Sequence, residues 1–146
     1  VDRVETTWAF RVALPIGTHV PFHCTASGKL FMSSLSTTRG RAMIKALSLD
    51  ALTLNTHTRT DSLGAELSAI RKEGFSLDRE EFHLGMVAIA VPVKDANGRF
   101  FAALAVHGPS QRFSIDSAHD SFAGMCDAAA QITAILFEKD AIDSAG

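Results

Sequence analysis

Two apolar runs of strand length, residues 86–93 and 100–107, lie close together in the second half of the chain. The segment that joins them contains Asn97-Gly98, a dipeptide typical of tight hairpin turns. The pattern therefore predicts an antiparallel hairpin. A loop with an even number of residues pairs Met86 with His107, or shifts every pair by one step, and both registers put the same residues on each face.

The two faces of this predicted hairpin differ in bulk. One face carries large apolar side chains that are predicted to pack against a helix: Val87, Ile89, Val91, Phe100, Leu104 and Val106. The opposite face, here called the alanine face, is formed by Met86, Ala88, Ala90, Ala103, Ala105 and His107. Its small side chains leave space that either receives a close-packed helix or forms the floor of a ligand cavity. The pattern leaves both alternatives open.

Helical spacing of apolar residues predicts two short helices in the first third of the chain. The first has Thr25 or Ser27 as its cap and continues through Met32. Because the first amides of a helix have no acceptor within it, this amino end is well placed to hold an anion. The second helix begins at Thr37 or at the next residue and extends to Leu47.

Two further helices are predicted on either side of the hairpin. One has Asp61 or Ser62 as its cap, after a polar loop over residues 55–60, and ends before Gly74. The other is predicted as one long helix over residues 116–138. Its apolar residues form a single stripe: Phe122, Met125, Ala129, Ile132 and Leu136.

The two ends of the chain carry weaker patterns. Residues 6–14 alternate between apolar and polar, which predicts a strand so close to the start that an upstream segment is expected to have been removed. The tail over residues 140–146 is expected to fray, so the domain is predicted to cover residues 1–139. Together these elements predict an α+β domain.

Composition narrows the class of protein. The chain has 146 residues, 47% of them hydrophobic, enough for one core, and no run approaches the roughly 18 apolar residues of a membrane span. The first residues lack the order of a signal peptide, which favours a cytoplasmic protein that makes no membrane contact. A formal charge of −2 without a basic stripe argues that this piece alone does not bind DNA.

Few patterns in the sequence point to catalysis or metal binding. Cys24 stands beside His23, but neighbours on an extended segment point to opposite sides, so a buried, reduced thiol is the preferred interpretation. The six histidines show neither helical spacing nor a Cys-x-x-Cys grouping. Ser27-Gly28-Lys29 lacks the leading glycine of a phosphate-binding loop. The sequence therefore predicts no catalytic residue, no cofactor and no metal-binding residue, and it leaves open whether a metal is bound.

An ordered set of short motifs does indicate a family. The set consists of Leu14-Pro15-Ile16-Gly17, residues 21–29, residues 60–75 with Glu66 and Leu67, Asp78, Glu80-Glu81 and Gly85, and the two runs of the hairpin. In this order and spacing it resembles the effector-binding domain of bacterial transcription regulators of the isocitrate-lyase-regulator (IclR) family. The resemblance covers nearly the whole chain.

That resemblance implies both a fold and a role. The fold is GAF-like or profilin-like, with a curved antiparallel sheet flanked by helices. The role is that of a small-molecule sensor and not an enzyme, in a protein that binds DNA through a winged helix-turn-helix domain absent from this chain. The family also implies a homodimer or a homotetramer. Two alternatives remain: a dimerisation module without a ligand, and a GAF-like enzyme that uses Asp78 or His107 as a base.

The resemblance also implies the residues that bind a small organic acid. They are Thr25, Ala26, Ser27, Asp78, Met86, Ala88, Ala105 and His107. Asp78 has a second interpretation as a turn residue, and His107 has a second one as a partner of the backbone. Small-acid binders of the family place Cys and Ser where this chain has Ala88, Ala105 and His107. A larger or less polar acid, such as an aromatic one, is therefore expected.

Overall fold

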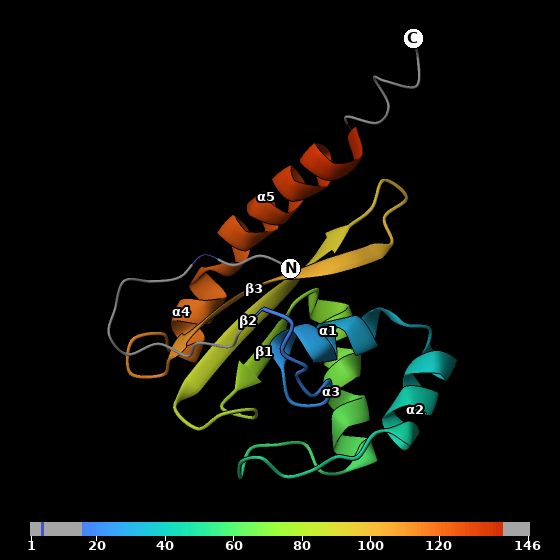
Figure 1. The fold of residues 1–146 in the computed structure, drawn as a ribbon, viewed down its shortest axis with the longest axis vertical. Coiled ribbons are helices and arrows are strands. Elements are labelled where there is room, and N and C mark those ends of the chain that lie inside the picture. The colour runs from blue at the N-terminus through green and yellow to red at the C-terminus, as the bar shows by residue number, and fades with distance from the viewer. Residues whose placement is uncertain (1–3, 5–15, 139–146) are drawn as a thin grey trace.

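The computed structural model describes Val4 and residues 16–138. The predicted first strand over residues 6–14 and the predicted tail over residues 140–146 lie outside the described residues. Within them the elements follow in this order: α1 (Ala26–Ser34), α2 (Thr37–Ala46), α3 (Thr60–Glu73), β1 (Ser76–Arg79), β2 (Met86–Lys94), β3 (Phe100–Pro109), α4 (Ile115–Asp120), α5 (Phe122–Thr133) and a π-helical segment η1 (Ala134–Glu138). Figure 1 shows helices on both sides of a narrow sheet.

The predicted hairpin is formed by β2 and β3 of the described sheet, whose strand order is β1-β2-β3 with antiparallel neighbours, so β2 is the central strand. Met86 pairs with Pro109 and Ala88 pairs with His107, so the observed register is the predicted one shifted by one step. Gly98 adopts a positive φ of 75° in the connecting turn, as the Asn-Gly signal predicts. The residues assigned to the alanine face therefore share one face.

One residue of the predicted core face lies on the wrong side. Phe100 was expected with Val87 and Leu104, but a β-bulge after Val93 shifts the pairing so that Lys94 faces Phe100. An extra residue in one strand reverses the alternation of side chains beyond it. Phe100 consequently packs with the helices that cover the alanine face, and its ring lies 5.8 Å from that of Phe31 on α1.

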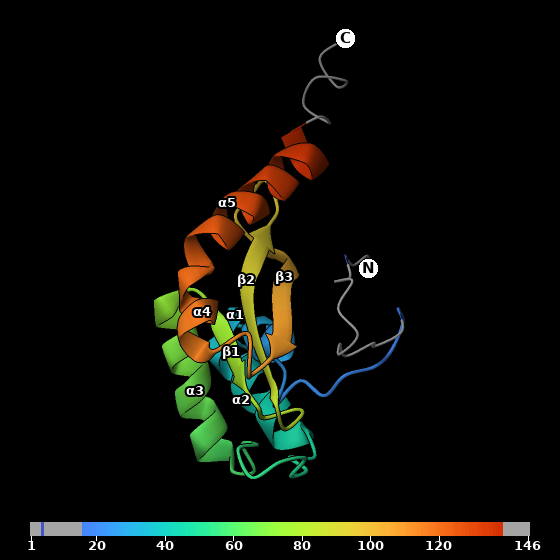
Figure 2. The ribbon, with the colours of Figure 1, turned by 90° about the vertical axis from the view of Figure 1, so that its left-hand side faces the viewer.

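Two hydrophobic clusters fill the space on the two sides of the sheet. On the alanine face, α1, α2 and α3 contribute Leu30, Ile44 and Leu67, together with Ala90 of β2. On the opposite face, α4 and α5 cover the large apolar residues of the strands, and Figure 2 shows these two helices running beside the hairpin. The sheet is thus the middle layer between two groups of helices.

The predicted long helix is not continuous. The structure divides it at Ser121, because the N–H of this residue is shared between the carbonyls of Ser117 and Ala118 and its hydroxyl also bonds the Ser117 carbonyl. A serine that bonds back to the preceding turn commonly bends a helix. Beyond Thr133 the π-helical segment changes the spacing again, and Leu136 is left exposed rather than in the stripe.

The other helix boundaries follow the sequence more closely. Gly74 ends α3 in the left-handed region with φ of 84°, as predicted. Asp61 or Ser62 was predicted as the cap of α3, yet the N-cap is Arg59, which makes no side-chain cap hydrogen bond, and the helix begins at Thr60. Strand β1 was not predicted, because four residues with only one large apolar side chain, Leu77, give too short a pattern.

Candidate effector site

The amino end of α1 is held by a cap and by a close approach of the preceding loop. Thr25 is the N-cap, and its Oγ1 accepts a hydrogen bond from the Gly28 N–H at 3.2 Å. A Cβ on Gly28 would lie 2.6 Å from the backbone of Phe22, so glycine is what lets this loop lie so close. The amides of Ala26 and Ser27 come first in the helix and have no acceptor within it.

The sheet register brings the strand residues of the predicted site onto one face. Asp78, Ala88 and His107 are Cα partners in a row across β1, β2 and β3. Met86 and Ala105 belong to the neighbouring rows of the same face. Asp78 and Met86 are buried and Ala88 is half-buried, whereas Ala105 and His107 are exposed among the described residues. The face therefore opens toward β3.

The alanine face has an inner part on β2 and an outer part on β3. Its inner part receives a close-packed helix, because Ala26 and Leu30 of α1 form one cluster with Ala90 and contact Ala88. Its outer part, on β3, is not covered in the same way. Of the predicted site residues on this face, Ala105 and His107 are therefore the exposed ones.

Asp78 has the turn role that the sequence left open. Its Oδ1 accepts hydrogen bonds from the N–H groups of Glu81 at 2.7 Å and Phe82 at 3.4 Å. Burial, with a further contribution from the Glu81 charge, raises the pKa of Asp78 to about 6 although these hydrogen bonds oppose the change. A carboxyl group with this pKa can either donate or accept a hydrogen bond near neutral pH.

Cys24 and His23 have structural roles. Cys24 is completely buried, and burial, together with the charges of Asp78 and Glu81, raises the pKa of its thiol to about 12. Such a thiol stays protonated and is a poor nucleophile. The His23 Nε2 atom lies 3.0 Å from the carbonyl oxygen of Asp50 in another loop. The interpretation of Cys24 as a buried, reduced thiol is confirmed.

A buried charge network lies beside this face, and the sequence did not predict it. Lys29 of α1 is completely buried, and its Nζ donates to Glu66 Oε1 at 3.1 Å and to Glu81 Oε1 at 2.5 Å. Arg79 Nη1 also donates to Glu66 Oε1 at 3.1 Å. A charged residue inside the apolar stripe of α3, at Glu66, is the sequence signal that could have indicated the network.

The network also changes the ionisation of its members. Burial tends to raise the pKa of Glu66, but the charge and hydrogen bond of Lys29, assisted by Arg79, outweigh it and lower the pKa. Burial lowers the pKa of His57, which favours the neutral imidazole. His57 Nε2 lies 3.8 Å from Glu81 Oε2, the oxygen of that carboxylate that Lys29 does not contact.

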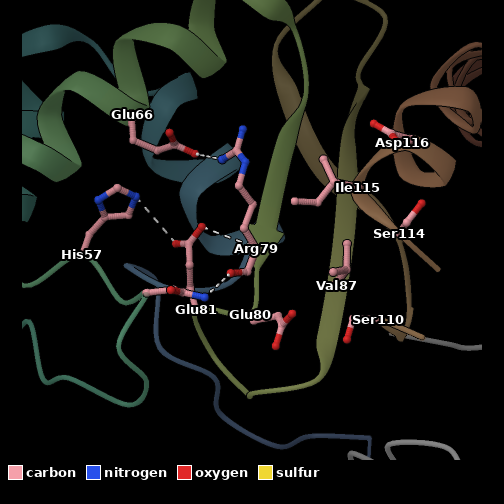
Figure 3. Close-up of a pocket in the computed structure, with 11 residues that line it drawn as sticks. His57, Glu66, Arg79, Glu80, Glu81, Val87, Ser110, Ser114, Ile115 and Asp116 are labelled. Carbon is pink, nitrogen blue, oxygen red and sulfur yellow. Dashed lines mark hydrogen bonds and ion pairs between the residues drawn. The ribbon is translucent and has the colours of Figure 1, made fainter. Parts of the chain in front are cut away.

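Two pockets open near these elements, and none of the eight predicted effector residues lines either of them. The larger, of about 730 Å³, is lined by His57, Glu66, Arg79 and Glu81 on one side and by the start of α4 on the other (Figure 3). The smaller, of about 430 Å³, lies between α2 and α3. Sequence spacing could not show the larger pocket, because its walls come from segments far apart in the chain.

Comparison with known sequences identifies the family. A family model for the C-terminal part of the bacterial transcriptional regulator IclR matches residues 1–134. The probable transcriptional regulator SauR of Cupriavidus necator is 40% identical over 116 residues, which are 80% of this chain and 46% of that protein. The acetate operon repressor of Salmonella typhimurium is 33% identical over 133 residues, 91% of this chain and 48% of the repressor. The chain thus spans about half the length of these relatives.

Solved structures agree on the fold. The crystal structure of Thermotoga maritima IclR matches with a TM-score of 0.84 at 28% identity, covering 92% of this chain and 55% of that one. The inducer-binding domain of PobR from Acinetobacter, a double mutant in complex with 3-hydroxybenzoic acid, matches with a TM-score of 0.78 at 29% identity, covering 87% of this chain and 75% of that one. The predicted α+β, GAF-like fold is confirmed.

The relatives also confirm the predicted class of protein, since they are named as transcription regulators and repressors and not as enzymes. In the part of the chain that the structure describes, none of the helices is long and apolar enough to span a bilayer. The chain belongs to the IclR family of bacterial transcription regulators and corresponds to the C-terminal domain of its members.

Proposed function

We propose that this chain is the effector-binding and oligomerisation domain of a cytoplasmic bacterial regulator that binds DNA through an amino-terminal winged helix-turn-helix domain. Family membership supports regulation of transcription. The share of the relatives that the chain covers, 46% of SauR and 48% of the acetate operon repressor, is consistent with a separate DNA-binding half. The domain would assemble as a homodimer or a homotetramer, which sets the spacing of two DNA-binding domains on an operator.

The observation that carries this proposal is the row Asp78, Ala88 and His107 beside the capped end of α1. Ala88, in the middle of the row, has a small side chain, and the row has a polar residue at each end. The free amides of Ala26 and Ser27 would bind a carboxylate, and Asp78 would bind a hydroxyl or carbonyl elsewhere on the ligand. An organic acid is the ligand class that this arrangement fits.

The size of the acid follows from the alanines. Ala88 and Ala105 offer no polar side-chain atoms and little volume, so the outer part of the alanine face suits a larger, less polar acid than glyoxylate or pyruvate. PobR, which shares 29% sequence identity with this chain over the matched part, binds 3-hydroxybenzoic acid in its solved complex. That ligand is an aromatic carboxylic acid, the class proposed here.

A thermal-shift screen of organic acids tests the proposal. An acid present at about one hundred times its dissociation constant should stabilise the folded domain by roughly 2.7 kcal/mol. Benzoate-type acids should raise the melting temperature, and Asp78→Ala or His107→Ala should abolish that shift. Matched changes at an aspartate and a histidine away from the row, Asp95→Ala and His83→Ala, should leave the shift intact. Micromolar binding of glyoxylate or pyruvate without preference for bulkier acids would contradict it.

Reciprocity gives a second test in the full-length protein. If the acid and the operator are linked through this domain, each must change the affinity of the other by the same factor. Operator affinity that stays constant at saturating acid would contradict the sensor role.

One observation favours a second candidate, a dimerisation module without a ligand. The packing of α1 onto Ala90 and Ala88 already fills the inner part of the alanine face. This candidate predicts that the domain dimerises and that no acid changes its melting temperature, which the same screen distinguishes.

A further inference from the structure

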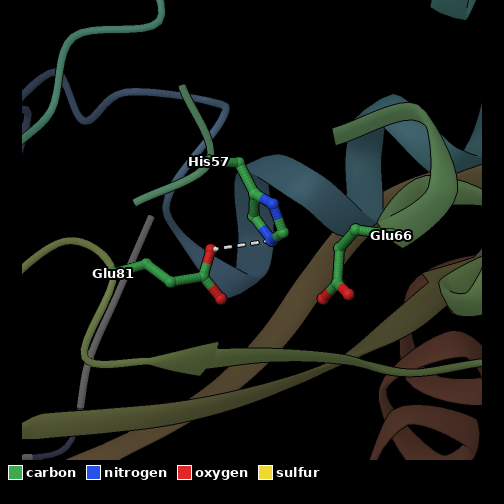
Figure 4. A group of neighbouring side chains, drawn as sticks. All are labelled: His57, Glu66 and Glu81. Atoms are coloured by element: carbon green, nitrogen blue, oxygen red, sulfur yellow. Dashed lines mark ion pairs between the residues drawn. The ribbon is translucent and has the colours of Figure 1, made fainter. Parts of the chain in front are cut away.

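We propose that His57, Glu66 and Glu81 form a binding site for a divalent transition-metal ion such as Zn²⁺, separate from the proposed effector site. His57 lies in the loop before α3, Glu66 lies on α3, and Glu81 follows β1, so the fold brings together three segments (Figure 4). Each residue offers one ligand atom, and these atoms all lie within 4.8 Å of one another. An imidazole and two carboxylates are a donor set that zinc accepts.

The carboxylate of Glu81 has an oxygen without a partner. Glu81 is only 2% exposed, and its Oε1 is occupied by Lys29. Its Oε2 is buried and makes no hydrogen bond in the structure. Burying a carboxylate oxygen without a partner is costly, so a group that satisfies it is expected. The nearest polar atom that the ion pairs give for it is His57 Nε2 at 3.8 Å.

The ring of His57 is already oriented for metal binding. Its Nδ1 lies 2.6 Å from Ser62 Oγ, and a metal-binding histidine usually donates its other ring N–H to such a partner. With the proton on Nδ1, the lone pair of Nε2 faces Glu81 Oε2. In this tautomer two acceptors lie 3.8 Å apart, and they repel each other unless a cation lies between them. An ion at about 2.0–2.1 Å from each atom fits within that separation.

The surrounding charges define what else the ion would bind. Lys29 and Arg79 already balance the two carboxylates through their Oε1 atoms, so a bound divalent ion adds net positive charge. Three protein ligands leave a tetrahedral ion one open position. The pocket of about 730 Å³ that these residues line gives access to that position. The fourth ligand is therefore a water molecule or a small anion from solvent.

Titration calorimetry of the purified domain with ZnCl₂, after dialysis against a chelator, tests the site. We expect one ion per chain and a loss of affinity of more than about 100-fold in His57→Ala. Ser62→Ala, which removes only the partner of the ring, should lose about tenfold. His57 does not hold Lys29, so its replacement leaves the ion pairs of that residue intact.

His83→Ala serves as the matched control, because it removes an exposed histidine from the neighbouring loop and should leave zinc affinity unchanged. Circular dichroism should show the same fold in all variants. Absence of stoichiometric zinc binding, or equal losses in His57→Ala and His83→Ala, would overturn the proposal, and Lys29 and Arg79 would then be the counterions of the two carboxylates.

Discussion

Two aspartates hold tight loops at opposite ends of β2, and their surroundings differ. Asp95 Oδ1 accepts hydrogen bonds from the N–H groups of Asn97 and Arg99, each at 2.9 Å, at the surface of the hairpin tip. The bond from the Arg99 backbone is the main cause that lowers the pKa of Asp95. Asp78 makes the same kind of bonds to Glu81 and Phe82, yet its pKa rises to about 6.

The comparison shows whether hydrogen bonding or burial determines the direction of the pKa shift of each aspartate. Hydrogen bonds to a carboxylate favour its charged form, and desolvation disfavours it. At the hairpin tip the aspartate keeps access to water, so the hydrogen bonds dominate. At Asp78, burial raises the pKa by more than the hydrogen bonds lower it. The same local motif therefore stabilises a charge at one end of the strand and resists it at the other.

The largest expected effect comes from removing a member of the buried network. Glu81→Ala leaves the completely buried Lys29 with only Glu66 as a partner, which should cost about 3–5 kcal/mol of unfolding free energy. Urea denaturation measures this loss. Asp127→Ala, on the exposed side of α5, is the control and should change stability by less than about 0.5 kcal/mol. Equal losses would show that burial does not distinguish the two regions.

Asp78→Asn tests the direction of the pKa shift at the buried Asp78. Because the folded pKa of Asp78 is raised from 3.8 to about 6, this group stabilises the folded state fully below pH 3.8 and loses that contribution as pH rises through 6. Asparagine keeps the acceptor oxygen without the charge. The stability of the wild type relative to Asp78→Asn should fall by about 3 kcal/mol across this range.

Urea denaturation at a series of pH values, with a chelator present, follows this difference. If the stability of the wild type relative to Asp78→Asn stayed constant or increased with pH, the hydrogen bonds from Glu81 and Phe82 would outweigh the effect of burial on the pKa.

The two cysteines extend the comparison to chemical reactivity. Cys24 is completely buried with a pKa of about 12, whereas Cys126 is exposed on α5. Because the thiolate is the reactive form, an alkylating reagent should modify Cys24 at least about 100-fold more slowly than Cys126 in the native domain. Mass spectrometry should find one modified thiol natively and two in urea. Rapid native labelling of Cys126→Ser would indicate that α1 opens frequently.

The smallest effect on stability is expected at Asp95 in the hairpin tip, and its dependence on pH should be opposite to that of Asp78. Since the pKa of Asp95 is lowered in the folded state, its contribution is present above the unfolded value and disappears as pH falls through the folded pKa. The wild type should therefore lose its advantage over Asp95→Asn on acidification. The same pH series measures it, and an advantage that increased in acid would contradict the assigned cause.

Local patterns predicted much of the fold. The Asn97-Gly98 turn, the shared face of the alanines and the end of α3 at Gly74 each depend on neighbouring residues, and each is found in the structure. The wrong predictions arise where a strand or a helix departs from the regular repeat of its side chains. A bulge after Val93 moved Phe100 to the other face, and Ser121 interrupted the last helix.

The site was less accessible to sequence reasoning. The row of Asp78, Ala88 and His107 follows from the register once β1 is known, but β1 itself is too short to recognise, and only the family resemblance selected Asp78. The buried network joins Lys29 to Glu66 and to Glu81, which are 37 and 52 residues away in the sequence. Sequence patterns relate residues only within one helix, strand or turn, and these side chains are brought together by tertiary packing alone.

The double ion pair of Lys29 has a mechanical consequence. It ties α1 at once to α3 through Glu66 and to the loop after β1 through Glu81. Separating either pair would leave the buried charge of Lys29 with one partner fewer, so a shift of α1 alone over the sheet is costly. A displacement of α1 is therefore expected to move α3 and that loop with it.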